Sequence, residues 1–432
     1  MHSLVVKLAK PAATPLVSTT VALPADLQIS QLIDHLPAEQ SLAFIRGRSG
    51  IIGYGETLRL SASGPNRMAE LAESWRGVVA DATIANDLSW PGTGLVAFGS
   101  MAFADESTAE SILIVPKLIL GSHDGKLWLT EIQTDNAHSL STNWTEVFAD
   151  AFTAGSAAET VLHAGQVTAE QFSANVETAL QAFENTDLQK VVLARDVFAP
   201  LPEQFDLRRV LRNLSERYQT CWVYNVDGTI GASPELLVRV SHGQVSARVL
   251  AGTAGRGTDP GIDRAIATAL ADSAKNVAEH AFAVKSLVDS LQPFCSHVDA
   301  DVTPFSLALP NLWHLASDVH GVLKTGTSSL DIAAALHPTA AVAGTPRQIA
   351  LDFIKRIEGV DRGRYAAPVG WISADGDGEW AIALRGGQIS VDETGAKTLR
   401  AFAGCGIVPG STAAAELAET RLKFAPIRDA LN

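Results

Sequence analysis

The sequence predicts an α+β fold built mainly from antiparallel sheets. Short apolar or alternating runs follow one another across tight turns, as where His242-Gly243 separates residues 235–241 from 244–250. Helical patterns are interleaved with such pairs of runs. The regular strand–helix–strand alternation of a doubly wound parallel sheet is missing, so we do not expect a Rossmann fold.

The first half of the chain has the pattern of strands and loops. Residues 42–61 predict two strands around a glycine-marked turn. Residues 93–100, 111–119 and 126–133 predict further short strands.

The second half alternates between helical and strand patterns. Predicted helices cover residues 168–186, 206–218, about 261–291, 345–358 and a final segment from about 411. Thr345-Pro346 suits an N-cap with proline at the first helical position. One predicted strand begins at Lys190, and others cover residues 221–227, 235–241, 244–250, 312–323 and 397–403. Residues 371–390 predict a hairpin, and the glycine-rich stretch 251–257 predicts a turn between a strand and a helix.

Composition sets limits on the class of protein. Among 432 residues, 47% are hydrophobic, which is enough for a large core and excludes a disordered chain. The 33 basic and 47 acidic residues give a net charge of −14, which argues against a nucleic-acid partner. No Pro/Ser-rich linker separates independent domains. We therefore expect one intertwined domain made of two halves. Residues 1–165 would form a strand-rich N-terminal half, and residues 166–432 the catalytic half.

Cysteine usage and hydropathy bear on the compartment. Cys221, Cys295 and Cys405 have no CxxC spacing, so neither a disulfide framework nor a zinc site is expected. No run approaches the ~18 apolar residues of a membrane span, and the first residues make a poor signal peptide. The expectation is a cytoplasmic protein without a membrane partner.

Common hydrolase and phosphate-loop motifs are missing from the sequence, but charged and polar residues stand inside apolar segments. These residues are Lys190, Glu235, Glu279, His280, His314, Arg385, Glu416, Glu419 and Lys423. The last three are spaced i, i+3 and i+7, which places them on one face of the final predicted helix.

Nine ordered blocks give these residues a context. They are KVVLAR (190–195), GASPELL (231–237), LAGTAGRG (250–257), EH (279–280), LWHLAS (312–317), LHPTAAVAGTP (336–346), RYAAPVGW (364–371), ALR (383–385) and AGCGIVPGSTAAAELAET (403–420). Together they resemble the chorismate-utilising enzymes of menaquinone, siderophore and tryptophan biosynthesis, and most of all the isochorismate synthases among them. RGRSGIIGYGE (46–56) resembles the N-terminal half of that family. The resemblance implies one domain whose two halves contribute antiparallel sheets to a sandwich flanked by helices.

The resemblance also implies a reaction on the chorismate ring. Water attacks C2, the double bonds shift, and the C4 hydroxyl leaves. Lys190 resembles the family's base, which must be neutral to accept a proton, and Glu235 resembles the acid, which must stay protonated. A solvated edge-strand lysine and a strand-end carboxylate are the alternative interpretations from the residues alone.

Mg²⁺ is the cofactor that the resemblance implies. Glu279 and Glu419 resemble its direct ligands, and Glu416 an acid that reaches it through water. A further acid of the family is replaced here by Asn276, which could weaken the site modestly. The alternative for Glu419 is a surface ion pair with Lys423, worth roughly 0.2–0.5 kcal/mol.

The remaining matches are substrate contacts. Arg385 and Lys423 resemble the cations that hold substrate carboxylates, with help from the Tyr365 hydroxyl and from backbone N–H groups at Gly404 and Gly406. His314 resembles a binding residue near the ring, and Thr253, Ala341 and Val342 would line the site. From the residues alone, Arg385 could be a strand-end arginine, Gly404 and Gly406 a turn, and His314 a hydrogen-bonded core histidine.

Lys190 bears on the choice within the family. Relatives that add ammonia usually carry Gln there, so lysine favours water as the nucleophile, and no glutamine amidotransferase subunit is expected. Salicylate synthases, which share Lys190 and Glu235 and also expel pyruvate, are the alternative activity. A non-catalytic homologue is the alternative of a different class, although four charges that would be costly to bury are all present.

Overall fold

The computed structural model describes residues 15–24, 32–37, 39–134, 144–148, 160–301, 303–308 and 312–432. The chain divides into two compact units. The first consists of Met1–Glu235, His337–Ala374 and Ala381–Asn432, and the second of Leu236–Leu336 and Asp375–Trp380. The predicted α+β class with antiparallel sheets is confirmed. The proposed division at residue 165 falls inside the first unit and stays a prediction.

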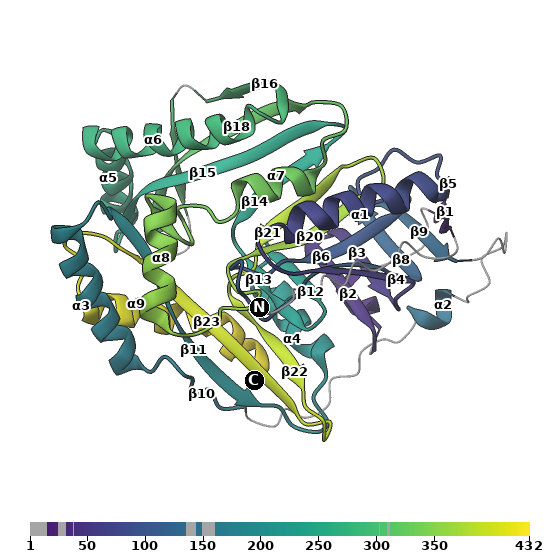
Figure 1. The fold of residues 1–432 in the computed structure, drawn as a ribbon, viewed down its shortest axis with the longest axis horizontal. Helices are drawn as coiled ribbons and strands as arrows, with labels where there is room; N and C mark the ends of the chain where they lie inside the picture. Colours follow the sequence, from purple (N-terminus) through teal and green to yellow (C-terminus); the bar gives the residue numbers. More distant parts are fainter. Residues whose placement is uncertain are drawn as a thin grey trace, which may run out of the picture. The chain divides into compact units, whose positions relative to one another are not determined.

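One large sheet runs through the first unit (Figure 1). Its strand order is β10 (His163–Ala164), β11 (Lys190–Pro200), β23 (Lys397–Ile407), β22 (Gly386–Val391), β13 (Thr229–Ser233), β12 (Trp222–Val226), β2 (Ser41–Arg46), β3 (Ser49–Tyr54), β8 (Leu118–His123), β9 (Lys126–Gln133), β1 (Val17–Ala22) and β5 (Thr83–Ala85), with β19 (Gly344–Thr345) pairing with β11. β1 and β5 are parallel, and the other pairs in this sheet are antiparallel.

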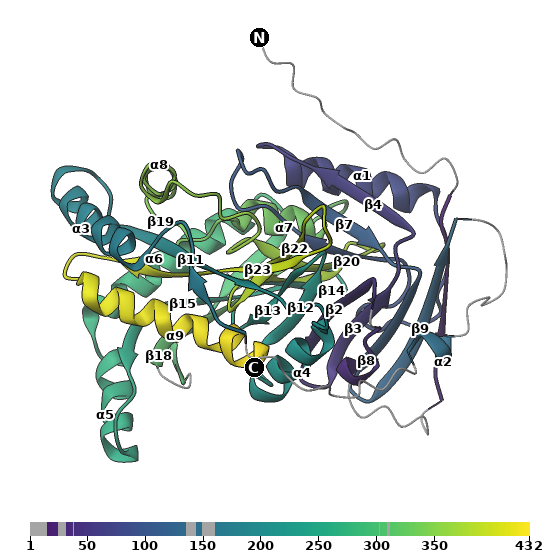
Figure 2. The same ribbon diagram turned by 90° about the horizontal axis from the view of Figure 1, so that it is seen from below.

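Smaller strands and helices complete the first unit. A second run of strands has the order β20 (Pro368–Ser373), β6 (Val96–Ser100), β7 (Ser111–Val115) and β4 (Leu58–Ala62). The helical segments are η1 (Leu32–His35), α1 (Arg67–Asp81), α2 (Trp144–Val147), α3 (Ala169–Asn185), α4 (Leu207–Arg217), α8 (Arg347–Glu358) and α9 (Ala413–Leu431). Viewed as in Figure 2, α9 runs along the strands β11 and β23.

Two buried clusters hold these layers together. One joins the large sheet to α4 and α9 through residues such as Val210, Ala401 and Ile427. The other joins β11 and β23 to α3 and α8 through residues such as Leu193 and Phe353. Burial of this apolar surface fixes the alternation of β11, so that Val191 and Leu193 face the helices.

The second unit is a sheet covered by helices. Its strands have the order β16 (Cys295–Ala300), β18 (Leu312–Leu323), β15 (Gln244–Gly255) and β14 (Leu236–Ser241), with β17 (Phe305–Ala308) pairing with β18. The helices are α5 (Pro260–Ala271), α6 (Ala274–Leu291) and α7 (Ser329–Leu336). Residues of β21 (Gly378–Ile382) belong to both units.

Three expectations about helices were wrong. The first half contains α1, whose buried Met68, Leu71, Trp75 and Val78 follow helical spacing. The single helix predicted for 261–291 is divided into α5 and α6, because Ser273 between them accepts a hydrogen bond from the Asn276 backbone and caps a new helix. Thr345 is a strand residue in β19 rather than a cap.

Three expectations about strands also need correction. Residues 42–61 contain parts of three strands, because β4 leaves the large sheet and pairs with β7. The predicted hairpin over 371–390 ends with β21, and β22 pairs instead with β13 and β23. The glycine-rich stretch 251–257 is strand up to Gly255, since β15 continues past a bulge between Ala251 and Thr253 to pair with β18.

Candidate active site

Lys190 begins β11, where it pairs with Thr345 of β19. The residue is half-buried. Its side chain lies over the opposite strand: a Cβ atom at Gly406 would be 2.9 Å from Lys190 Cε and 3.6 Å from Nζ. Gly406 therefore leaves the space that this lysine occupies. β11 is paired at this position, so Lys190 does not lie on an open sheet edge.

Glu235 stands between β13 and β14, and its backbone is fixed on both sides. Its N–H donates to Ser233 Oγ at 3.2 Å, and its carbonyl accepts from Ile382 N at 3.0 Å. Burial raises the pKa of the Glu235 carboxyl, and the positive charges of Lys190, Arg385 and Lys423 oppose this shift. All three cations are therefore close enough to act on the same carboxyl group.

Arg385 lies in the turn from β21 to β22 and has the left-handed backbone φ of 54°. Such a conformation is unusual for a residue with a side chain and occurs where the surroundings enforce it. The next residue, Gly386, lies so close to Ile230 that a Cβ atom would reach its carbonyl oxygen. On the other side, Tyr224 Oη donates to the Leu384 carbonyl at 2.9 Å. The turn is thus held in place around Arg385.

Lys423 reaches β23 from α9. Its Nζ donates to the Gly404 carbonyl at 2.7 Å and pairs with Glu419 Oε1 at 2.6 Å. The Glu419 side chain is 46% exposed, so its pair with Lys423 lies partly in solvent. Glu416 lies one turn earlier, and its carbonyl accepts a hydrogen bond from Cys405 Sγ at 3.3 Å.

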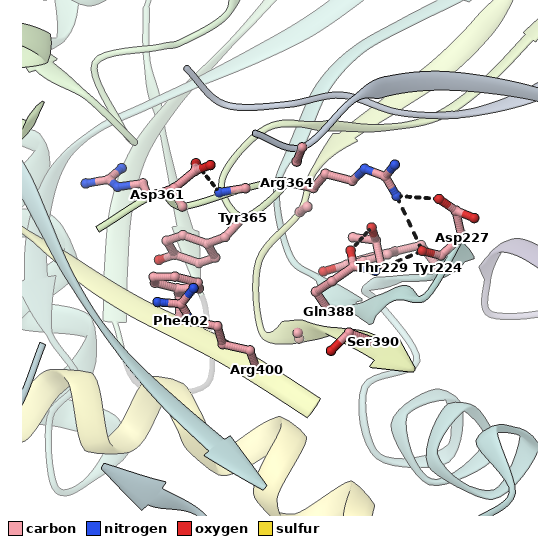
Figure 3. A pocket seen from close by; sticks show the side chains of 16 residues that line it. Tyr224, Asp227, Thr229, Asp361, Arg364, Tyr365, Gln388, Ser390, Arg400 and Phe402 are labelled. Atoms are coloured by element: carbon pink, nitrogen blue, oxygen red, sulfur yellow. Dashed lines mark hydrogen bonds and ion pairs between the residues drawn. The ribbon is translucent and has the colours of Figure 1, made fainter. Parts of the chain in front are cut away.

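Tyr365 lies beside this group, stacked on Phe402 with ring centroids 5.3 Å apart (Figure 3). Burial raises the pKa of Tyr365 to about 12, so its hydroxyl stays protonated at neutral pH and can donate. The two rings form part of the wall of a cavity of about 310 Å³. Two hydrogen-bonded pairs also line this cavity. Arg364 Nη1 donates to Asp227 Oδ2 at 2.9 Å, and Thr229 Oγ1 donates to Gln388 Oε1 at 2.7 Å.

Ala341 and Val342 lie in the turn that leads into β19. Val342 is buried and Ala341 is exposed. Arg362 Nη1 donates to the Val342 carbonyl at 3.0 Å, and Val192 N donates to the Ala343 carbonyl at 2.8 Å. These bonds hold the turn against β11, two residues beyond Lys190.

The other predicted residues belong to the second unit. Thr253 of β15 is paired directly with His314 of β18. Glu279 lies on α6 beside the buried His280, whose Nε2 is 2.9 Å from Ser317 Oγ. Asn276 contributes to the start of α6, because its Nδ2 donates to Ser273 Oγ at 2.9 Å.

The first unit thus brings Lys190, Glu235, Arg385 and Lys423 together, with Gly404, Gly406 and Tyr365 beside them. The functional roles assigned to all of these residues stay predictions. Among the described residues, His, Cys, Asp and Glu form no cluster of three or more that could hold a metal ion. None of the described helices has both the length and the apolar character needed to cross a membrane.

A sequence profile of the family described as "Chorismate binding enzyme" matches residues 5–432. The chain belongs to the chorismate-binding enzyme family. A homologue of isochorismate synthase MenF from Mycobacterium tuberculosis is 41% identical over 264 residues, which cover 58% of this chain and 70% of the relative. The salicylate biosynthesis isochorismate synthase of Pseudomonas aeruginosa is 32% identical over 396 residues, which cover 88% and 82%.

The fold of this chorismate-binding enzyme is shared with a solved structure, that of MenF, the menaquinone-specific isochorismate synthase from Escherichia coli. The TM-score is 0.76 at 23% identity, and the likeness covers 98% of this chain and 96% of that one. The resemblance expected from the nine sequence blocks is therefore confirmed at the level of family and fold.

Two features beside the site were missed in the sequence. One is Phe402, which faces the same side of β23 as Gly404 and supports Tyr365. The other is the buried ion pair of Arg362 and Glu358, at 2.5 Å, with side chains 2% and 1% exposed. Glu358 accepts from Ala194 N, and Arg362 donates to the Val192 carbonyl, so the pair anchors β11. Its i, i+4 spacing was visible in the sequence.

Proposed function

We propose that this chorismate-binding enzyme is an isochorismate synthase, which interconverts chorismate and isochorismate. The observation that carries the proposal is the Glu235 carboxyl, whose pKa burial raises while Lys190, Arg385 and Lys423 lie around it. A carboxyl group whose pKa is raised, beside a lysine, suits a reaction that removes one proton and supplies another. The isochorismate synthase names of the family relatives support the same activity.

In the proposed reaction, Lys190 in its neutral form takes a proton from a water molecule as the water oxygen bonds to C2. The ring double bonds shift, and the bond between C4 and its hydroxyl oxygen breaks. Glu235 gives its proton to that hydroxyl, which leaves as water. One water enters and one leaves, so the sum is an isomerisation. Lys190 then loses a proton and Glu235 regains one by exchange with solvent.

Binding the substrate requires local positive charge, because a chain of net charge −14 repels a dianion at long range. Arg385 can hold a carboxylate through two parallel hydrogen bonds, and Lys423 supplies a second cation. The protonated Tyr365 hydroxyl can donate to the same group, and we assign backbone N–H groups at Gly404 and Gly406 to the same anion. We assign Thr253, His314, Ala341 and Val342 to the lining of the bound ring.

Mg²⁺ is part of the proposal. Glu416 and Glu419 place two carboxylates one turn apart on α9, a hard oxygen donor set of the kind that Mg²⁺ takes together with several waters. Glu419 and Glu279 would hold the ion directly, with Glu416 acting through water. When bound, Mg²⁺ would offset the negative charge of the substrate's ring carboxylate. Activity without a glutamine amidotransferase subunit, and a cytoplasmic location, also stay predictions.

The function is tested by incubating the purified chain with chorismate and Mg²⁺ in ¹⁸O-labelled water. We expect isochorismate that carries one ¹⁸O at C2, activity that stops with EDTA, and recovery when Mg²⁺ is added back. Unlabelled isochorismate would contradict water attack, and salicylate with equimolar pyruvate would assign the alternative activity. Activity that ignores EDTA would remove the metal from the proposal.

A further inference from the structure

A second cavity of the first unit does not include the residues of the candidate active site. It lies between β10, β11, the start of α3 and one face of α9. It has a volume of about 400 Å³, within the range of roughly 300–1,000 Å³ found for small-molecule sites. Leu162, Val197 and Phe424 supply apolar wall, and three arginines supply positive charge: Arg195, Arg421 and Arg428.

Arg195 is the buried member of the three. It is 8% exposed, its Nε donates to Thr420 Oγ1 at 2.7 Å, and its guanidinium lies 4.9 Å from the centre of the Phe424 ring. Among the described parts of the chain, no carboxylate forms an ion pair with Arg195, and the bond to Thr420 is the only hydrogen bond of its guanidinium. Burial, and then the charge of Arg421, lower the pKa of this guanidinium. An anion in the cavity would offset both the burial of the Arg195 charge and its repulsion by Arg421.

Arg421 and Arg428 come from α9. Phe424 follows Arg421 at i+3 and Arg428 follows Arg421 at i+7, so the three lie on one face of the helix. Arg421 also has no ion-pair partner among the residues that the structure describes, whereas Arg428 pairs with Asp429 at 2.7 Å. The one carboxylate in the cavity lining is Glu170. Its own backbone N–H and the Thr168 hydroxyl lower the pKa of Glu170, so this acid is engaged locally at the start of α3. The lining therefore keeps an excess of positive charge.

We propose that this cavity binds the phosphate group of a small phosphomonoester. Guanidinium groups match the oxygens of a phosphate dianion through paired hydrogen bonds, and three of them converge here. The apolar wall of Leu162, Val197 and Phe424 gives room for an organic part beyond the phosphate. Inorganic phosphate shares the same recognition chemistry.

The position of the cavity gives such a ligand a structural consequence. Arg195 follows Lys190 by five residues on β11, so its side chain faces the opposite side of the sheet. Arg421 is two residues before Lys423 on α9. A phosphate held by Arg195 and Arg421 would tie together the strand and the helix that carry residues of the candidate active site.

Binding is tested by calorimetry on the full chain at low salt, separately with inorganic phosphate, glycerol 3-phosphate and malonate. We expect one saturable site for both phosphates, and at least tenfold weaker binding of malonate. Arg421→Gln and Arg428→Gln should each weaken phosphate binding about tenfold. Arg195→Lys, which keeps the charge and removes the fork, should weaken it as much. Arg264→Gln on α5, an exposed arginine outside the cavity, is the matched control and should bind as the wild type.

Several outcomes would overturn the proposal. These are no saturable phosphate binding, equal or tighter binding of malonate, or unchanged affinity in Arg421→Gln and Arg428→Gln. Both of these arginines are on the surface side of α9, and unchanged melting temperatures would show that the variants fold. Because binding is measured directly, the result is independent of whether chorismate is converted.

Discussion

The end of the Lys190 side chain lies against Gly406, where a Cβ atom would approach Lys190 Cε to 2.9 Å. The two residues are on neighbouring strands, β11 and β23, and face the same side of the sheet. The position of the proposed base is thus set by a glycine more than two hundred residues later in the chain. This contact makes a mutation that adds one methyl group informative.

We predict that Gly406→Ala lowers kcat by at least tenfold while the fold is kept. The added methyl displaces Lys190 from its place above β23, and even small misplacement of a catalytic group costs rate. Steady-state kinetics with chorismate would measure this effect. Gly77→Ala is the control, since Gly77 is exposed on α1 with nothing within 4 Å of the added atom. Equal kcat values in the two variants would contradict the placement of Lys190.

Glu235 should make stability depend on pH in a predictable direction. The pKa of the Glu235 carboxyl is raised in the folded state above the ordinary value of about 4.5. At pH values between the ordinary and the raised pKa, the folded state therefore binds more protons than the unfolded state. The contribution of Glu235 to the free energy of unfolding therefore falls as pH rises through this window. Glu235→Gln lacks this loss, so its stability relative to wild type should increase from pH 5 to pH 8. Urea unfolding at both pH values measures it, and a constant difference would argue against the raised pKa.

The buried pair of Arg362 and Glu358 should be a strong determinant of stability. Arg362→Ala leaves the Glu358 charge buried without its partner, which typically costs about 3–5 kcal/mol. The exposed pair of Lys355 and Glu106, with side chains 66% and 51% exposed, is the matched comparison. Lys355→Ala should cost no more than about 1 kcal/mol. Denaturant unfolding of the two variants tests this, and similar losses in both would show that burial of the pair is unimportant.

Tyr365→Phe should separate the hydroxyl from the ring. The stack on Phe402 remains, but a protonated donor toward the substrate carboxylate is lost. We expect KM for chorismate to rise about tenfold with kcat changed only a few-fold. Tyr54→Phe in β3 is the control. If KM is unchanged in Tyr365→Phe, the hydroxyl does not contact the substrate.

Local sequence patterns predicted part of this fold. Thr168 accepts a hydrogen bond from Gln171 N and caps α3 as expected, and the β-branched run after Lys190 is the strand β11. Errors arose where pairing partners decide the outcome. β22 and β4 follow short turns in sequence, but each joins a strand that is remote along the chain. Helix α1 was missed although its apolar spacing was present.

The site divides in the same way. Lys190 and Glu235 were recognisable from their blocks, but their approach depends on β11, β13 and β23 lying in one sheet, which no local pattern specifies. The left-handed conformation of Arg385 and the Tyr365–Phe402 stack likewise result from tertiary contacts. Arg195 belongs to the same block as Lys190, and its burial beside a second cavity was equally invisible in the sequence.

The central claim is that Lys190 and Glu235 act as base and acid on one molecule of chorismate. Its most direct test is the turnover of chorismate by Lys190→Ala and Glu235→Gln, compared with wild type under the same Mg²⁺ concentration. Each variant should lose at least a hundredfold in kcat while its circular dichroism matches that of the wild type. Wild-type turnover in either folded variant would contradict the claim.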